Sequence, residues 1–228
     1  MKCSSLVLGV LATLAAAQTP SPYTDAKSGI IFNTLQHSSG MFFGLALPAN
    51  ATGNTDFIAT IGGKGTGWSG VSLGGGMLNK LLIVAWPNAQ TVVGSFRKTA
   101  YVQDEKLQRQ SDANSSSQYA SPAVATGTFT QTTIANGTYV NSTHWTYTFL
   151  CSKCIQIDGT TFKPTDTAPS LGFAFNPTAP AQKTNPASSV SKHTAQGQAV
   201  FDLSKAKSAN FEIWKGYAVP KVATGFAG

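Results

Sequence analysis

Two side chains with donor atoms suited to a redox metal stand in loops of this sequence. Met77 follows the glycines Gly74–Gly76 and does not lie in an apolar strand, so it is not an obvious core residue. His193 ends a long loop and precedes a predicted strand. A thioether and an imidazole on opposite sides of an iron make a six-coordinate electron-transfer haem of raised potential. Taken alone this pairing is a weak signal, and a loop methionine and a loop histidine are more often ordinary loop positions.

Other catalytic arrangements have less support. Among the nine carboxylates only Asp104 and Glu105 are close together, and adjacent residues of a strand point to opposite faces. A glycosidase pair therefore has no sequence support. The chain has no G-x-S-x-G, H-E-x-x-H or phosphate-binding motif, and no predicted helix follows Gly74–Gly76. A hydrolase is the weakest of the hypotheses.

The remaining histidines offer a competing metal site. His37 lies in a turn-like Gln-His-Ser-Ser segment, and His144 begins a strand on its threonine face, so both are predicted to be surface residues. A three-histidine site that includes His193 stays open at this point. A copper site of the polysaccharide monooxygenase type needs an N-terminal histidine, whereas the mature chain is expected to begin at Gln18.

Residues 1–17 have the pattern of a secretory signal peptide. Lys2 precedes the apolar run Leu6–Ala16, which is too short to span a bilayer, and small residues follow at a cleavage site. No later segment is long and apolar enough to span a membrane, so we expect a secreted protein, with an uncleaved anchor as the alternative. Glycosylation is predicted at the N-x-S/T sequons of Asn50, Asn114, Asn136 and Asn141.

The two cysteines outside the signal segment, Cys151 and Cys154, form a C-x-x-C pair. In an oxidising compartment such a pair is more often a disulfide than a redox pair or half of a zinc site. Strand-like residues flank the pair on both sides, whereas a thioredoxin-type motif opens a helix. We therefore predict a structural disulfide.

The charge balance is basic but diffuse. The formal net charge is +7, and loss of Lys2 with the signal peptide lowers it by one to +6. No run of Lys and Arg forms a nucleic-acid-binding stripe, and Arg97–Lys98 and the Lys205/Lys207 pair are predicted to be ordinary solvated positions. A mildly basic surface favours acidic partners or anionic glycans.

The elements that must position these residues are predicted to be short strands. Apolar or alternating runs end repeatedly at Gly, Pro or Asn, and no amphipathic helix of ten or more residues is predicted. This pattern predicts one all-β domain over 18–228, an antiparallel immunoglobulin-like sandwich. The expected strands are 29–32, 41–47, 57–61, 81–86, 91–96, 127–133, 144–150, 170–175 and 199–203. Long loops are expected at 108–121 and 176–192.

At these same residues the sequence resembles the cytochrome domain of fungal cellobiose dehydrogenases, a haem b iron-reductase domain related to the DOMON sandwiches. The most specific block is Gly67–Pro87, which contains Met77. The other matching segments extend over essentially the whole mature chain: Gly29–Thr34, Gly44–Pro48, Thr99–Tyr101, Asn141–Trp145, Phe149–Cys154 and Ser191–His193.

The resemblance implies haem b held by loops at one end of the sandwich, with Met77 and His193 as axial ligands and Tyr101 beside a propionate. It also supports the disulfide. It implies a monomeric extracellular electron carrier of lignocellulose degradation. Electrons would come from a flavin dehydrogenase or a small reductant and pass to a copper polysaccharide monooxygenase, ferric iron or a quinone. A ferric reductase activity stays open.

Three departures from the family are visible. Ser69 and Gly63 stand where the family usually has a cysteine pair, and a further bridge near the C-terminus is absent. No flavin dehydrogenase or cellulose-binding segment is recognised after the domain, so an electron relay or iron reductase is expected, not a cellobiose oxidase. The chain is basic, whereas domains of this family are commonly acidic, so its partner is expected to differ.

A haem-free DOMON-like module that binds a sugar or another ligand is the alternative function. Four tryptophans would then supply stacking faces: Trp68, Trp86, Trp145 and Trp214. Core packing is the favoured interpretation for Trp86 and Trp145.

Overall fold

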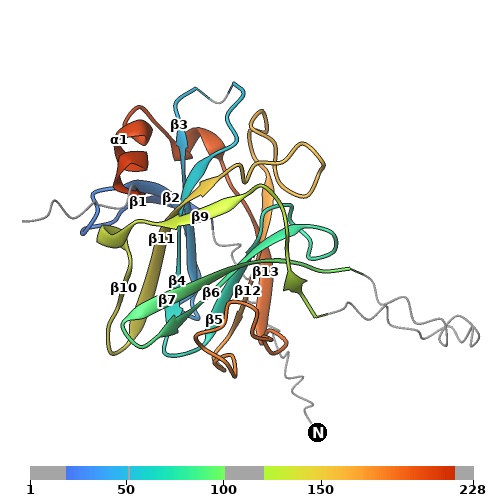
Figure 1. Cartoon of the computed structure of the whole chain (residues 1–228). Helices are drawn as coiled ribbons and strands as arrows, with labels where there is room; N and C mark the ends of the chain where they lie inside the picture. Colours follow the sequence, from blue (N-terminus) through green and yellow to red (C-terminus); the bar gives the residue numbers. More distant parts are fainter. Residues whose placement is uncertain (1–18, 51, 101–120, 219–228) are drawn as a thin grey trace, which may run out of the picture.

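The computed structural model describes residues 19–50, 52–100 and 121–218, which fold as a β-sandwich of two packed sheets (Figure 1). The predicted all-β antiparallel architecture is confirmed. Within the described residues the α-helix is limited to α1 (Phe211–Lys215), and no helix there is long and apolar enough to cross a membrane.

The first sheet has eight strands in the order β1-β2-β3-β4-β11-β10, with β14 beside β3 and β9 beside β11. Its pairs are antiparallel except for the parallel pair of β14 and β3. The strands are β1 (Ser21–Thr24), β2 (Ile31–Gln36), β3 (Phe42–Pro48), β4 (Phe57–Lys64), β9 (Thr130–Thr133), β10 (Tyr139–Val140), β11 (His144–Ser152) and β14 (Lys207–Ser208).

The second sheet has six antiparallel strands in the order β13-β12-β5-β6-β7-β8. The strands are β5 (Trp68–Ser72), β6 (Leu81–Asn88), β7 (Thr91–Lys98), β8 (Ala123–Val124), β12 (Ser170–Asn176) and β13 (Ala195–Val200). This sheet carries both candidate ligand segments, since Met77 follows β5 and His193 precedes β13.

The main core lies between the two sheets. Strand alternation brings Trp145, Tyr147 and Phe149 of β11 inward, as predicted, against residues such as Val71 of β5 and Ile83 of β6. The rings of Tyr147 and Phe149 stack with centroids 4.7 Å apart.

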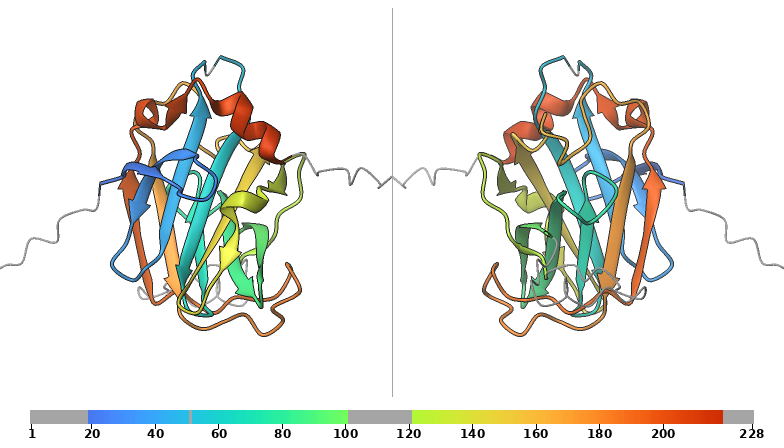
Figure 2. Two further views of the ribbon diagram at one scale, coloured as in Figure 1. Left: turned by 90° about the vertical axis from the view of Figure 1, so that its left-hand side faces the viewer. Right: turned by 90° about the vertical axis from the view of Figure 1, so that its right-hand side faces the viewer.

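Each outer face carries a smaller apolar cluster of its own. On the eight-stranded sheet, Phe211 and Trp214 of α1 cover Phe32 and Ile58. On the six-stranded sheet, Trp68, Val84 and Trp86 pack with Val190, which belongs to the segment between β12 and β13. Figure 2 shows that this segment (orange) and α1 (red) lie near opposite ends of the sandwich. A helix thus covers one outer face and an irregular loop covers part of the other.

Strands β5 and β13 of the six-stranded sheet differ from the prediction, and the two-residue strand β8 was not expected either. β5 was not expected as a strand, because glycine and serine dilute its apolar pattern, yet all five of its residues are buried. β13 begins at Ala195, four residues earlier than predicted, and Leu203 opens the 3₁₀-helix η3 (Leu203–Ala206) instead of ending a strand. The earlier start places His193 close to the sheet.

Candidate cofactor site

The loop that carries Met77 runs from the end of β5 to the start of β6 and is held close to β12. Gly75 adopts φ 84°, in the left-handed region that glycine tolerates. A Cβ added to Gly172 of β12 would lie 2.2 Å from the carbonyl oxygen of Gly75, so the close approach requires a glycine. The hydroxyl of Ser72 donates to the carbonyl of Gly76. Met77 itself is half-buried.

Hydrogen bonds to two other segments fix the far side of the same loop. The amide of Asn79 donates to the carbonyl of Thr99 at 2.9 Å, beside a parallel bridge between Leu78 and Thr99. The Nζ of Lys80 donates to the carbonyl of Gly159 at 2.7 Å. The Met77 loop is thus fixed by β7 and by the segment between β11 and β12.

His193 lies directly before β13 and is also fixed through its neighbours. The amide of Thr194 donates to the carbonyl of Phe175 at 2.9 Å, and Nδ2 of Asn176 donates to the carbonyl of Lys192 at 2.5 Å. Burial lowers the pKa of the His193 imidazole below its ordinary value, and the nearby charge of Lys192 lowers it further. The neutral imidazole is the form that binds a metal.

The strand register places the two candidate ligands on one sheet but at opposite ends of its strands. Ser72 pairs with Gly172, and Phe175 pairs with Ala195. The two ends are therefore about 10 Å apart along β12, at about 3.3 Å per residue. This differs from the expectation that loops at one end of the sandwich hold the cofactor, since the Met77 loop and the His193 segment come from opposite ends of β5, β12 and β13.

Small residues of the outer face lie between those two ends. Gly70 of β5 pairs with Ala174 of β12, so both lie on the outer face. The indole of Trp68 lies beside this position, with its Cζ3 3.2 Å from where a Cβ of Gly70 would be. Small and apolar residues thus form a strip of the outer face between the Met77 loop and His193.

The loop that leads to His193 is held on the outer face through its own carbonyl groups. Nε1 of Trp86 donates to the carbonyl of Lys183 at 2.8 Å, and the hydroxyl of Ser95 donates to that of Pro186 at 2.7 Å. Strand side chains therefore donate, and the loop backbone accepts.

Arg97 of β7 takes the largest share of these bonds and corrects a prediction. It was expected to be solvated, but it is 2% exposed. Its Nη2 donates to the carbonyls of Pro186 and Ser188 at 2.5 and 2.7 Å, and its Nε donates to the hydroxyl of Ser95 at 2.7 Å. Within the described residues its partners are carbonyl and hydroxyl oxygens and include no carboxylate. The available sequence signal was that Ser95 and Arg97 alternate on one face of a strand. Because β7 pairs with the buried strand β6, this face points outward and is covered by the loop.

The donor set fits a haem better than a cluster-bound metal. Within the described residues no three His, Cys, Asp or Glu side chains gather, so the three-histidine site does not form there. One thioether and one imidazole remain, which are haem ligands. Next to the Met77 loop, the Oγ1 of Thr99 is fully buried and has no hydrogen-bond partner in the described structure. A bound group with polar substituents would satisfy it.

The other predicted residues lie elsewhere. His37 and His144 are half-buried, and their Nδ1 atoms lie 2.9 and 2.8 Å from hydroxyls of neighbouring residues; His37 also contacts the Phe173 ring. The Cys151–Cys154 disulfide is confirmed. Asn50, Asn136 and Asn141 are exposed, and their glycosylation stays a prediction. Tyr101 and Asn114 fall outside the described residues.

Two further features bear on ligand binding. All four tryptophans are buried: Trp68, Trp86, Trp145 and Trp214 are at most 5% exposed. A surface hollow of about 760 Å³ lies beside Asn50 and Asp202, away from Met77 and His193. Neither feature offers an exposed indole for stacking on a sugar.

Comparisons with known proteins agree with this geometry. The family model described as "Cytochrome domain of cellobiose dehydrogenase" matches residues 23–213. A pyrroloquinoline quinone-dependent pyranose dehydrogenase of Coprinopsis cinerea is 26% identical over 222 residues, which are 94% of this chain and 28% of the relative. The chain therefore spans less than a third of that protein.

Two solved structures share the fold. The cytochrome domain of Myriococcum thermophilum cellobiose dehydrogenase is 29% identical, with a TM-score of 0.72 over 90% of this chain and 99% of that one. The cytochrome b domain of pyranose dehydrogenase from Coprinopsis cinerea is 22% identical, with a TM-score of 0.71 over 88% and 96% of the two chains, and bears on the fold alone.

Proposed function

This chain belongs to the family of cellobiose dehydrogenase cytochrome domains, and from that premise we propose that it is a secreted b-type cytochrome domain carrying single electrons. Family membership makes it a cytochrome domain with a haem-type cofactor, an electron-transfer role and a redox partner. The proposal adds the type of haem, its two ligands and the electron donors and acceptors.

Met77 and His193 are the proposed axial ligands. The observation that carries this assignment is their placement: a thioether and a neutral imidazole stand at the two ends of one apolar strip, each in a segment fixed by hydrogen bonds. Haem iron supplies the ferric–ferrous couple when bound. A haem held by both Met77 and His193 would offer no open position to a substrate, and it would supply electron transfer through its edge.

The residues around the ligands perform three tasks in this proposal. Gly75 and Gly172 allow the Met77 loop to lie against β12. Asn176 and Arg97 hold the loop that ends at His193. The buried hydroxyl of Thr99 is available to a polar substituent of the cofactor, and Tyr101 is proposed to serve a propionate beside it.

The proposed donor is a flavoenzyme or a small reductant, and the proposed acceptor is a copper polysaccharide monooxygenase, ferric iron or a quinone. The relatives named above include a cellobiose dehydrogenase and a pyranose dehydrogenase, so a sugar-oxidising partner is the natural source of electrons. The signal-like residues 1–17 support an extracellular setting.

The test is the absorption spectrum of the purified chain produced with haem supplied. We expect a low-spin b-type spectrum that is reduced by ascorbate or dithionite. His193→Ala and Met77→Ala should each abolish or convert this spectrum, because one axial donor is removed. His144→Ala is the matched control and should leave it unchanged. A folded chain with no reducible low-spin haem would contradict the proposal.

A further inference from the structure

The charged side chains in the main segments of the six-stranded sheet are all positive. Residues 65–100 and 170–200, which form β5, β6, β7, β12, β13 and their connections, contain five Lys or Arg residues and no Asp or Glu. Every carboxylate of the described structure therefore comes from other segments. A surface with one sign of charge attracts partners of the opposite sign over a distance set by the ionic strength.

The exposed cations of this set lie at both ends of the candidate cofactor site. Lys98 is exposed at the end of β7 and directly precedes Thr99, which contacts the Met77 loop. Lys192 is exposed and adjacent to His193. Lys183 is exposed in the loop whose carbonyl accepts from Trp86. These three lysines, Lys98, Lys183 and Lys192, are here called the lysine rim.

Asp158, from the segment between β11 and β12, is close enough to Lys98 to interact with its charge, but its carboxylate already accepts hydrogen bonds from Thr160. Asp158 accepts from the amide and hydroxyl of Thr160 at 2.9 and 2.6 Å. The hydrogen bonds from Thr160 lower the pKa of Asp158, and the charge of Lys98 lowers it further. Its sequence neighbour Ile157 is 95% exposed, so an exposed apolar side chain lies beside the carboxylate that feels the charge of Lys98.

We infer that the lysine rim is the docking surface for an acidic protein partner of the electron-transfer reaction. This inference rests on the proposed function. The uniform sign of the charges selects an acidic surface and steers its approach to the cofactor edge. The exposed Ile157 favours a protein partner over a glycan, because protein interfaces combine an apolar centre with a polar rim.

The experiment follows electron transfer by stopped flow from the reduced, haem-loaded chain to an acidic blue-copper protein at low ionic strength. The double variant Lys98→Glu/Lys192→Glu should lower the second-order rate constant by about tenfold or more, within the range of electrostatic steering. Added salt should slow the unmodified chain and should have little effect on the variant.

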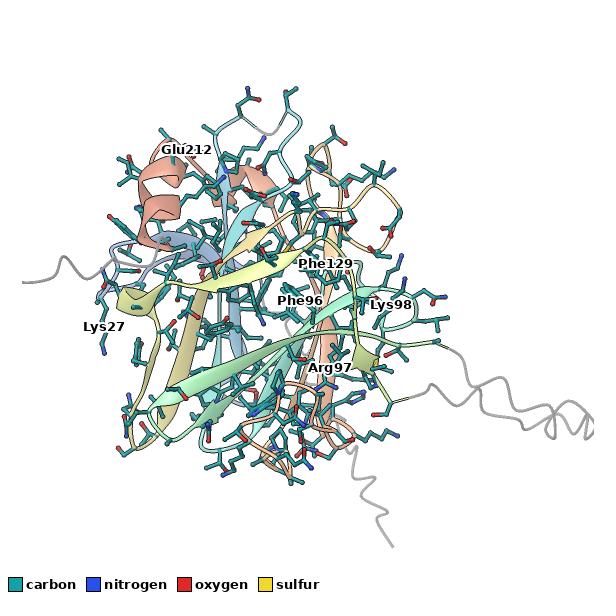
Figure 3. All side chains as sticks on the ribbon, viewed as in Figure 1. Lys27, Phe96, Arg97, Lys98, Phe129 and Glu212 are labelled. Atoms are coloured by element: carbon teal, nitrogen blue, oxygen red, sulfur yellow. A yellow bond between two sulfur atoms is a disulfide. The ribbon has the colours of Figure 1, made fainter. Side chains whose placement is uncertain are left out.

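The control variant Lys27→Glu/Lys207→Glu has the same net charge, with both changes on the eight-stranded sheet side of the molecule. Figure 3 shows Lys27 and Lys98 on opposite sides. The control should keep more than half of the original rate constant. Equal slowing of both variants would mean that the rate depends on the net charge of the chain and not on the lysine rim, which would overturn the inference. An unchanged rate constant in the rim variant would also overturn it.

Two further measurements separate this inference from the proposed function. Reduction of benzoquinone, a neutral acceptor, should proceed at the same rate in all variants; no haem spectrum or no quinone reduction would be a failure of the proposed function. Retention on heparin–agarose tests a glycan. If the rim variant loses retention but keeps its rate with the copper protein, the surface binds an anionic glycan and the inference is overturned.

Discussion

The two sheets of the sandwich differ in what covers them and in how their charges are paired. The eight-stranded sheet has α1 on its outer face, and its ion pairs join acids to bases: Lys215 bonds Asp56 at 2.8 Å and Lys205 approaches Asp202 at 3.8 Å. The six-stranded sheet carries a loop and cations without carboxylates. The difference indicates that one sheet supplies a stable support, while polar side chains of the other hold the loop before His193, at the proposed cofactor site.

The largest expected effect is on the core shared by both sheets. Phe149 is fully buried in β11, and Phe149→Ala should lower the free energy of unfolding by about 4 kcal/mol. Chemical denaturation measures the loss. In molecules that remain folded, the haem spectrum should be unchanged, since β11 carries neither ligand segment. Loss of the haem spectrum in the folded fraction would show that the eight-stranded sheet also shapes the cofactor site, which contradicts the proposed separation of the two sheets.

Arg97→Leu should have the next largest effect. It leaves the buried carbonyl of Ser188 without its donor and the carbonyl of Pro186 with the Ser95 hydroxyl alone, so we expect a loss of about 3 kcal/mol in unfolding free energy. Unlike Phe149→Ala, it should also weaken haem retention, measured by transfer to apomyoglobin, because the loop before His193 is released. Arg97→Lys keeps the charge but loses the several N–H donors of the guanidinium. It should therefore restore little of the stability and little of the haem retention.

Gly172→Ala tests the other ligand segment. Its Cβ would lie 2.2 Å from the carbonyl oxygen of Gly75, so the Met77 loop must move, at a cost of about 2 kcal/mol. We expect a shifted or high-spin fraction in the haem spectrum. Gly216→Ala, where a Cβ would meet no atom within 4 Å, is the control and should show neither change.

The smallest effect is expected at the ion pair of the eight-stranded sheet. Burial tends to raise the pKa of Asp56, but the hydrogen bond and charge of Lys215 and the Lys153 amide bring it below its ordinary value of 3.8. The unfolded chain thus binds the proton more readily, so this stabilisation is present above about pH 4 and is lost as the pH falls through and below it.

Asp56→Asn should cost about 0.5 kcal/mol at neutral pH, because the amide oxygen still accepts from Lys153 while the ion pair is lost. The difference in unfolding free energy between the two chains should shrink on acidification toward pH 3. A difference that is independent of pH would show that the charge of Asp56 contributes nothing.

The sequence predicted the regular parts of this fold from alternation, as in β11, where aromatic residues alternate with threonines. It missed β5, since a strand rich in glycine and serine has no hydrophobic period, although pairing with β6 and β12 buries it fully. Met77 and His193 were predicted as ligands and stay a prediction, but their positions at two ends of one sheet depend on register, which no local pattern encodes. Arg97 was misassigned because the loop that covers it is about ninety residues away in sequence.

The loop before His193 is held by side chains of the sheet that donate to its main-chain carbonyls, and every residue type supplies a carbonyl. The exposed lysine side chains of the loop can therefore change without removing these hydrogen bonds. Lys183 and Lys192 can be replaced in evolution, or by design, while Trp86, Ser95, Arg97 and Asn176 keep the path of the chain. Partner choice and cofactor ligation are then separately mutable properties, which lets one scaffold acquire new redox partners by surface substitution alone.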